Sequence, residues 1–168
     1  MSEHRVALVR TQSELEAAFD IRERVFVDEQ GVAPDVEYDG KDTTAVHALG
    51  VVEGSPAGTA RCRRIDASTG KIERVAVRPA YRRRGLGRAL MQTMEGALAT
   101  AGCEEIVLHA QRAVVSFYRE LGYHRVGDSF EEAGIPHVGM RRTLSDPPVA
   151  VDLSTARNAT ALTDVTES

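Results

Sequence analysis

The amino-acid sequence predicts an α/β fold, with one mixed central sheet flanked by helices in a single domain. Strand-like and helix-like segments follow one another in the order strand, helix, strands, helix, strand, helix, strands. Residues 85–101 carry one apolar stripe at steps of three and four residues, which predicts a long amphipathic helix. A length of 168 residues suits one domain with its own core.

The N-terminal part of the chain predicts a strand, a helix and a polar loop. The apolar run at residues 6–9 is typical of a short strand. Ser13 and Glu16 have the spacing of a capping box, so we expect the first helix to begin there and to end before Gly31. The acidic residues 28–42 predict a loop, or a loop with one short helix.

The middle of the chain predicts an antiparallel arrangement of strands. The strand-like segments are residues 45–52, 57–65 and 72–77. The tripeptide Gly54-Ser55-Pro56 and residues 66–70 supply the turns between them. Pro79 closes the third strand because proline has no N–H group for a sheet.

The second half of the chain alternates helices and strands. The helix at 85–101 ends at Gly102, a residue suited to the left-handed position after a helix. Shorter apolar segments predict a strand at 105–109, a helix at 114–121 and final strands at 123–126 and 137–143. From Ser145 the pattern stops, so we place the domain at 1–144 and expect a disordered or weakly attached tail at 145–168.

The composition argues against several classes of protein. A net charge of −4 with 5% aromatic residues does not favour a nucleic-acid binder. No run approaches the roughly 18 apolar residues of a membrane span, and no signal peptide is evident, so we expect a cytoplasmic protein. Cys62 and Cys103 lack the spacing of metal ligands, and we expect two buried small side chains and no metal site.

A basic, glycine-rich turn leads into the helix at 85–101. A helix N-terminus carries free N–H groups and about half a positive charge, so it favours an anion. Gly85 and Gly87 lack the Cβ atoms that would hold a phosphate away from the backbone. The same segment supplies charge-assisted donors, the guanidinium groups of Arg82, Arg83, Arg84 and Arg88. We therefore expect a phosphate cradle at 82–88, and a solvated basic turn that caps the helix is the alternative.

The pattern of this turn distinguishes between phosphate-binding families. Neither G-x-x-x-x-G-K-[ST] nor G-x-G-x-x-G occurs in the chain. Instead, Arg82-x-x-Gly85-x-Gly87, directly after a V-x-P strand end, resembles the pyrophosphate motif of the GNAT acyltransferases. Two later segments also resemble that family, and two others resemble its ElaA-like branch: Leu108–Gln111 and Phe117–Tyr123, then Ile21–Gln30 and Phe130–Met140. The resemblance covers about residues 5–143.

The resemblance implies a GNAT fold with acetyl-CoA as co-substrate and no metal. The pantetheine arm would lie between the strands at 72–77 and 105–109, where backbone groups would hold it like an added strand. The residues so implied in cofactor binding are Val75, Ala76, Val77, Arg82, Arg83, Arg84, Gly85, Leu86, Gly87, Arg88, Gln111 and Tyr118.

The resemblance also implies direct attack of an amine on the thioester. Tyr118 stands at the Phe-Tyr position of the family and would protonate the departing thiolate, with a core tyrosine as the alternative. Glu73 is the candidate general base, with a water relay or a salt-bridged carboxylate as alternatives. Plain alternation puts Glu73 on one face with Val75 and Val77, and a bulge in this strand would change that.

The acceptor is expected to be a primary amine on a small molecule or a peptide, and its identity stays open. Candidate substrate-binding residues are Arg22, Glu29, His47 and His137, and a structural role is the alternative for both histidines. Four acidic residues share one long loop: Glu29, Glu37, Asp39 and Asp42. This loop would attract a cationic amine or would simply be solvated.

Two further functions fit parts of the sequence. A CoA-binding sensor or scaffold without turnover would keep the phosphate cradle at 82–88 but would not catalyse acyl transfer. Nucleic-acid contact through residues 82–84 would use the same arginines, although the negative net charge argues against it. A homodimer stays open.

Overall fold

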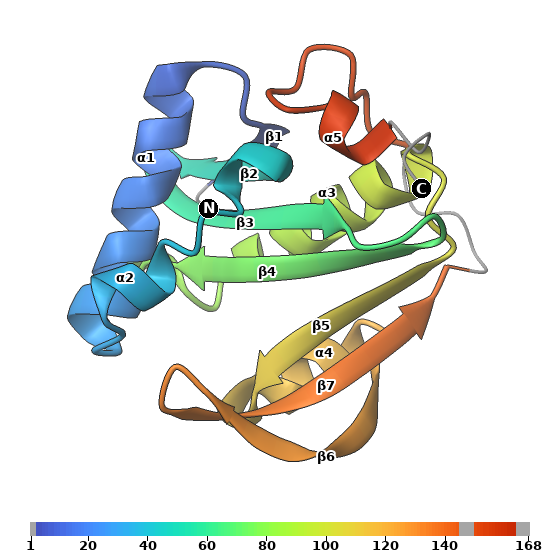
Figure 1. Cartoon of the computed structure of the whole chain (residues 1–168). Helices are drawn as coiled ribbons and strands as arrows, with labels where there is room; N and C mark the ends of the chain where they lie inside the picture. Colours follow the sequence, from blue (N-terminus) through green and yellow to red (C-terminus); the bar gives the residue numbers. More distant parts are fainter. Residues whose placement is uncertain (1–2, 145–149, 164–168) are drawn as a thin grey trace.

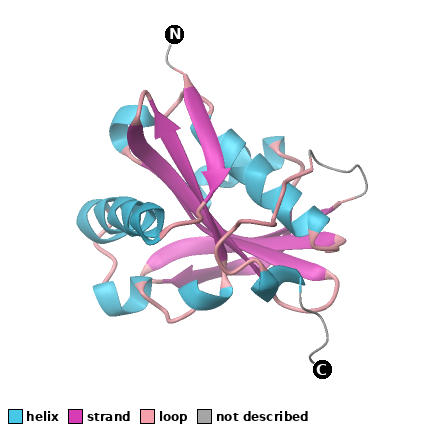
Figure 2. Cartoon of the chain, turned by 90° about the horizontal axis from the view of Figure 1, so that it is seen from above, coloured by secondary structure: helices cyan, strands magenta, loops and turns pink. Residues whose placement is uncertain are grey.

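The computed structural model describes residues 3–144 and 150–163, and these form a seven-stranded mixed sheet with helices on both faces (Figure 1, Figure 2). The sheet order is β1-β2-β3-β4-β5-β7-β6. Only β4 and β5 run parallel, and the other neighbours are antiparallel. The strands are β1 (His4–Leu8), β2 (Val46–Val52), β3 (Ser55–Arg64), β4 (Thr69–Val77), β5 (Glu105–Gln111), β6 (His124–Glu132) and β7 (Ile135–Thr143). The expected mixed α/β sheet is confirmed.

The helices divide between the two faces of the sheet. The longer ones are α1 (Gln12–Arg22), its π-helical continuation η1 (Glu23–Glu29), α3 (Leu86–Thr100) and α4 (Val115–Glu120). The short ones are α2 (Pro34–Glu37), η2 (Asp42–Thr44), η3 (Pro79–Tyr81), η4 (Arg112–Val114) and α5 (Thr160–Thr163). A large apolar cluster includes the buried side chains of α3, and a separate small cluster lies under α1 and η1.

The N-terminus of α1 differs from the expectation by two residues. Thr11, not Ser13, caps the helix: its hydroxyl accepts from the Glu14 N–H at 3.1 Å, and the Glu14 carboxylate accepts from the Thr11 N–H at 3.1 Å. Both Thr11-x-x-Glu14 and Ser13-x-x-Glu16 have the motif's spacing, so the sequence pattern could not distinguish them.

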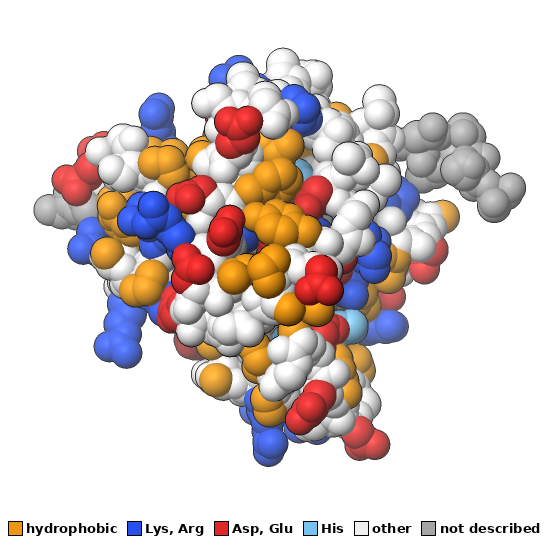
Figure 3. All heavy atoms as spheres, turned by 60° about the vertical axis from the view of Figure 1, so that its left-hand side comes forward, with side chains coloured by type: hydrophobic (Ala, Val, Ile, Leu, Met, Phe, Trp, Pro, Cys, Tyr) orange, Lys and Arg blue, Asp and Glu red, His pale blue; other side chains and the backbone are white. Residues whose placement is uncertain are grey.

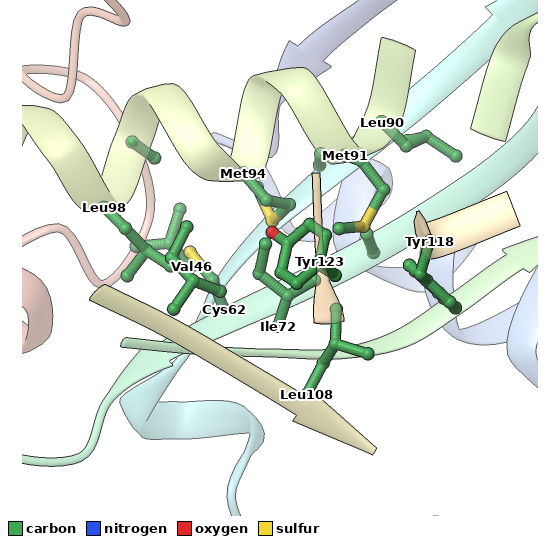
Figure 4. Close-up of a cluster of buried hydrophobic side chains, with 14 of the residues drawn as sticks. Val46, Cys62, Ile72, Leu90, Met91, Met94, Leu98, Leu108, Tyr118 and Tyr123 are labelled. Atoms are coloured by element: carbon green, nitrogen blue, oxygen red, sulfur yellow. The ribbon is translucent and has the colours of Figure 1, made fainter. Parts of the chain in front are cut away.

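The main core lies between α3 and the sheet (Figure 4). Leu90, Met94 and Leu98 are fully buried there, and each contributes about 1.5–3 kcal/mol by leaving water. Gly70 permits close packing, because a Cβ atom at this position would lie 2.6 Å from Leu98 Cδ2. Cys62 is a free, fully buried thiol, and Cys103 is also free and buried, as expected.

The C-terminal segment packs onto the domain between residues 150 and 163. Leu162 is fully buried, and Arg64 Nε donates to its carbonyl at 2.6 Å. The Asn158 amide donates to the carbonyl groups of Asp42 and Ala45 at 3.2 and 3.0 Å. A disordered or weakly attached tail was expected from residue 145, and the structure shows residues 150–163 in contact with the domain, while residues 145–149 and 164–168 lie outside the described part. Two isolated leucines anchor this segment, and they create no periodicity that a sequence pattern could detect.

Candidate active site

The opening of the sheet between β4 and β5 defines the site. These two strands pair only from Thr69 to Lys71 on β4, with Lys71 opposite Val107, and then separate (Figure 1). Residues 72–77 of β4 therefore face the gap with backbone groups that no described strand of the chain pairs on that side. A strand edge of this kind can bind an extended ligand through main-chain hydrogen bonds.

A β-bulge in β4 stands beside this opening. One residue of β3, Ala60, faces two of β4, Arg74 and Val75, because Thr59 pairs with Ala76 and Arg61 with Glu73. Arg74 takes the left-handed conformation, with φ of +57°. Ile72 consequently packs in the core under α3, whereas Ala76, four residues on, joins the small cluster beneath α1 and η1. The bulge therefore moves Glu73 to the face opposite Val75 and Val77, both of which pack against the α3 core.

A cavity of about 540 Å³ fills the opening. This volume lies within the range of small-molecule sites in proteins. It has walls from η1, α2, β4, β5, α4 and the β6–β7 hairpin. Of the residues expected from the sequence, it brings together Glu73, Val75, Ala76, Val77, Arg82, Gln111, Tyr118 and His137.

The basic turn lies at the edge of this cavity. Arg83 and Gly85 have positive φ angles of 65° and 84°. Gly85 is the N-cap of α3, and no side chain at this position accepts a hydrogen bond from the helix N–H groups. The first N–H groups of α3 are thus free to face an anion. Arg82, Arg83, Arg84 and Arg88 are exposed, with Arg84 over the Tyr81 ring, whereas the Leu86 side chain lies in the core and leaves only its backbone N–H for a ligand.

Two side-chain bridges connect the end of η1 to the basic turn and to β5. Arg82 donates to both carboxylate oxygens of Glu29, at 2.8 and 2.7 Å. The hydrogen bond from Arg82 lowers the pKa of Glu29 below its ordinary value. The Gln111 amide donates to Gln30 Oε1 at 2.9 Å across the cavity. Glu29 therefore contacts the basic turn and does not border the cavity.

Tyr118 lies at the inner wall of the cavity. It is 8% exposed, and its ring packs edge-on against Phe117 at 5.0 Å and Tyr123 at 6.1 Å. Burial raises its pKa to about 12, so the hydroxyl is protonated at neutral pH. Among the described residues none accepts a hydrogen bond from this hydroxyl, which leaves it available to a ligand.

Glu73 is held by three cations. Arg63 Nε lies 2.7 Å, Arg61 Nη2 3.1 Å and Lys71 Nζ 3.5 Å from its carboxylate. Burial opposes ionisation of Glu73, but the hydrogen bond from Arg63 and the charges of Arg61, Arg63 and Lys71 outweigh it and lower the pKa to about 2. The salt-bridged alternative is the one observed, and so low a pKa makes this carboxylate a weak proton acceptor.

The acidic loop forms a buried ion network. Arg22 and Arg61, 1% and 0% exposed, contact its carboxylates: Arg22 those of Glu37 and Asp42, and Arg61 those of Asp39 and Asp42. These carboxylates of the loop are thus paired with arginines and are not simply solvated. Figure 3 shows further acidic side chains around an apolar patch on the face of α1 and α2. Charged residues are normally exposed, so the residue types alone do not indicate this burial.

Arg22 and His47 do not border the cavity. His47 is fully buried, with Nε2 3.1 Å from the Asp42 carbonyl and its ring edge-on to Phe19 at 6.0 Å. Burial lowers the pKa of His47, so the ring is neutral at neutral pH. The structural alternative therefore fits His47, and the same holds for the buried guanidinium of Arg22; the structure gives no support to substrate contact by either.

Sequence reasoning missed a second cluster on the opposite wall. His109 Nδ1 lies 2.8 Å from Glu132 Oε1, and both side chains border the cavity. His137 Nδ1 lies 2.7 Å from the Ile135 carbonyl, and the ring of Phe130 stacks on it at 6.1 Å. His109 and Glu132 are 23 residues apart, and only the pairing of β5, β7 and β6 brings them together.

The fold and the cavity together define the class of protein. A mixed sheet that opens between two parallel strands, with a basic glycine turn before the following helix, characterises the acyltransferases that use coenzyme A thioesters. Residues 24–144 match the family model described as the acetyltransferase (GNAT) domain, and the chain belongs to this family. Members of the family bind acyl-CoA and an acceptor, and the chain is accordingly an acyltransferase.

Individual relatives support an ElaA-like branch. The chain is similar to the uncharacterized N-acetyltransferase YjcF of Bacillus subtilis, with 34% identity over 82% of the chain and 99% of the relative. It is 35% identical to ElaA of Escherichia coli over 79% of the chain and 89% of ElaA. The ElaA crystal structure superimposes with a TM-score of 0.72 and 32% identity, over 84% of the chain and 99% of ElaA.

Neither a membrane-spanning helix nor a metal site is found among the described residues. No helix in 3–144 or 150–163 is long and apolar enough to cross a membrane. In the same part of the chain, no cluster of His, Cys, Asp and Glu side chains could hold a metal ion.

Proposed function

We propose that this protein transfers the acetyl group of acetyl-CoA to a primary amine, by direct attack of the amine on the thioester. The observation that carries the proposal is the cavity between the separated strands β4 and β5, bordered at one edge by the basic turn. The family membership supports acyl transfer, and the protonated Tyr118 at the inner wall supports a thiolate leaving group.

The residues of the turn fit a diphosphate. A Cβ atom at Gly85 would have His4 Cε1, at 3.8 Å, as its nearest neighbour, so this glycine leaves open space beside the helix N-terminus. The N–H groups of Leu86, Gly87 and Arg88 and the guanidinium groups of residues 82–84 would hold the phosphates. Val75, Ala76 and Val77 would bind the pantetheine arm through backbone groups, and Gln111 would face it from β5.

The catalytic assignments follow from protonation states. The ammonium group of an amine must lose a proton before its nitrogen can attack the thioester carbon. When the C–S bond breaks, the Tyr118 hydroxyl donates a proton to the sulfur and regains one from the attacking amine nitrogen through solvent. Glu73, with a pKa of about 2, acts better as a fixed negative charge near the acceptor than as its direct base.

Release of free thiol from acetyl-CoA tests the proposal. The assay would offer n-butylamine, a peptide with a free N-terminus and a peptide with an internal lysine. Removing the proton donor in Tyr118→Phe should lower kcat by about 10²- to 10⁴-fold while CoA still binds. Tyr81→Phe, outside the cavity lining, is the matched control. Binding of CoA without thiol release from any amine would instead support a sensor or scaffold.

A further inference from the structure

The pair His109 and Glu132 has the geometry of a catalytic dyad on the wall facing β4. His109 stands two residues beyond Val107, the last β5 residue paired with β4, and so lies where the opening begins. Its Nδ1 is 2.8 Å from Glu132 Oε1. Both side chains border the cavity, and no role in the proposed reaction has so far been assigned to either.

The tautomer of His109 follows from its partner. Glu132 is ionised at neutral pH, since the hydrogen bond from His109 lowers its pKa further. An ionised carboxylate only accepts hydrogen bonds, so the proton of the neutral His109 ring lies on Nδ1. Nε2 then carries the lone pair, which is the state required of a base.

The neighbouring charges do not supply a better proton acceptor. Glu73 and Lys71 border the cavity from β4, and the cations around Glu73 make it a weak base. The remaining charged or titratable groups that line the cavity are Glu37, Asp39, Lys41, Arg74, Arg82, Tyr118 and His137. Of these, Glu37 and Asp39 are ion-paired to arginines.

His137 is the competing histidine. Its Nδ1–H donates to the Ile135 carbonyl, so its Nε2 also carries a lone pair. A neutral carbonyl stabilises an imidazolium ion less than the Glu132 carboxylate does. His137 is 7% exposed, whereas the side chain of His109 is 36% exposed and can pass a proton to water. Both comparisons favour His109.

We infer that His109 is the general base of the acetyl transfer, with Glu132 fixing its tautomer and stabilising its protonated form. This inference rests on the proposed function. Nε2 of His109 removes one proton from the substrate ammonium and later releases it to water. The neutral nitrogen then attacks the thioester carbon and the C–S bond breaks. The nitrogen loses its second proton to solvent, and the thiolate receives one proton, so the protons balance.

The basicity of the acceptor provides a specific test. Butylammonium needs a base at neutral pH, whereas trifluoroethylamine is already largely neutral. His109→Gln should lower thiol release with butylamine by about 10²- to 10⁴-fold and with trifluoroethylamine far less. Glu132→Gln should cause a smaller loss of the same kind. His124→Gln, at an exposed position outside the cavity lining, should change neither rate, and CoA affinity should stay constant in all three variants.

Several results would overturn the inference. Equal losses with both amines would show that His109 only shapes the site, and an unaffected His109→Gln beside an impaired His137→Gln would assign the base to His137. Imidazole ¹⁵N NMR of the wild type adds a readout that needs no turnover, and a proton on Nε2 of His109 would refute the dyad. Absence of thiol release by the wild type with every amine would instead refute the proposed function itself.

Discussion

The contact between Glu29 and Arg82 leads to a quantitative prediction about cofactor affinity. Arg82 belongs to the turn proposed to hold the diphosphate, yet here it donates two hydrogen bonds to Glu29. A phosphate must displace this carboxylate before it can use the guanidinium fully. Glu29→Gln removes the competing charge and leaves a side chain of the same size, so CoA should bind more tightly.

The magnitude follows from the exposure of the pair. The two side chains are 38% and 37% exposed, so solvent screens their attraction. Exposed ion pairs contribute about 0.2–1 kcal/mol, which corresponds to a roughly 1.4- to 5-fold decrease in the Kd for CoA. Screening by salt should shrink the difference between variant and wild type.

Isothermal titration with CoA at low and high salt would measure the effect. Glu104→Gln is the control, because it makes the same change in net charge at an exposed position outside the cavity lining. Weaker binding by Glu29→Gln would refute the reasoning, since Glu29 would then contribute to the cofactor site. An equal gain in CoA affinity by Glu104→Gln would show that the change in net charge alone causes the effect.

Three further predictions concern stability, each measured by urea unfolding. Gly70→Ala places a Cβ atom 2.6 Å from Leu98 Cδ2 and should destabilise the fold by about 1–3 kcal/mol; an unchanged unfolding midpoint would mean that α3 shifts freely. Asn158→Ala removes two hydrogen bonds to backbone carbonyl groups and should cost about 1–3 kcal/mol, whereas a loose C-terminal segment would show no loss. Glu73 has a folded-state pKa lowered from 4.5 to about 2, so its contribution is complete above pH 4.5 and is lost as the pH falls toward 2. The deficit of Glu73→Gln, on the order of 3 kcal/mol at pH 7, should therefore close across that window, and a deficit independent of pH would contradict the ion pairing.

The fold could be predicted because its elements carry regular apolar patterns. The stripe along 85–101 marked α3, and short apolar runs marked the strands, since burial on one face imposes these periods. The phosphate cradle expected at 82–88 followed from the glycines and arginines before a helix N-terminus, whereas its assignment to coenzyme A and the role of Tyr118 came from the family resemblance. The capping box was assigned to Ser13 and not to Thr11, because both residues are followed by a glutamate three positions later.

The buried ion network and the pair of His109 and Glu132 could not be predicted from the sequence. Their members are far apart in the chain, as Arg61 is from Asp39, and each residue alone has the ordinary meaning of a surface charge. The bulge at Arg74 decides which side chains of β4 face the cavity. Arg74 has a left-handed φ although it is not a glycine, so its residue type does not indicate the bulge. Contacts of this kind depend on strand order and register, which local patterns do not specify.

The docking of residues 150–163 bears on how the protein should be shortened for experiments. The family match ends at residue 144, which invites a truncation there. Such a truncation would remove Leu162 from the main cluster and the amide that fixes the backbone of Asp42, the carboxylate partner of Arg22 and Arg61. The ion network beside the cavity would lose this support from behind, so low activity of a truncated protein would report on the missing contacts and not on the chemistry of the cavity.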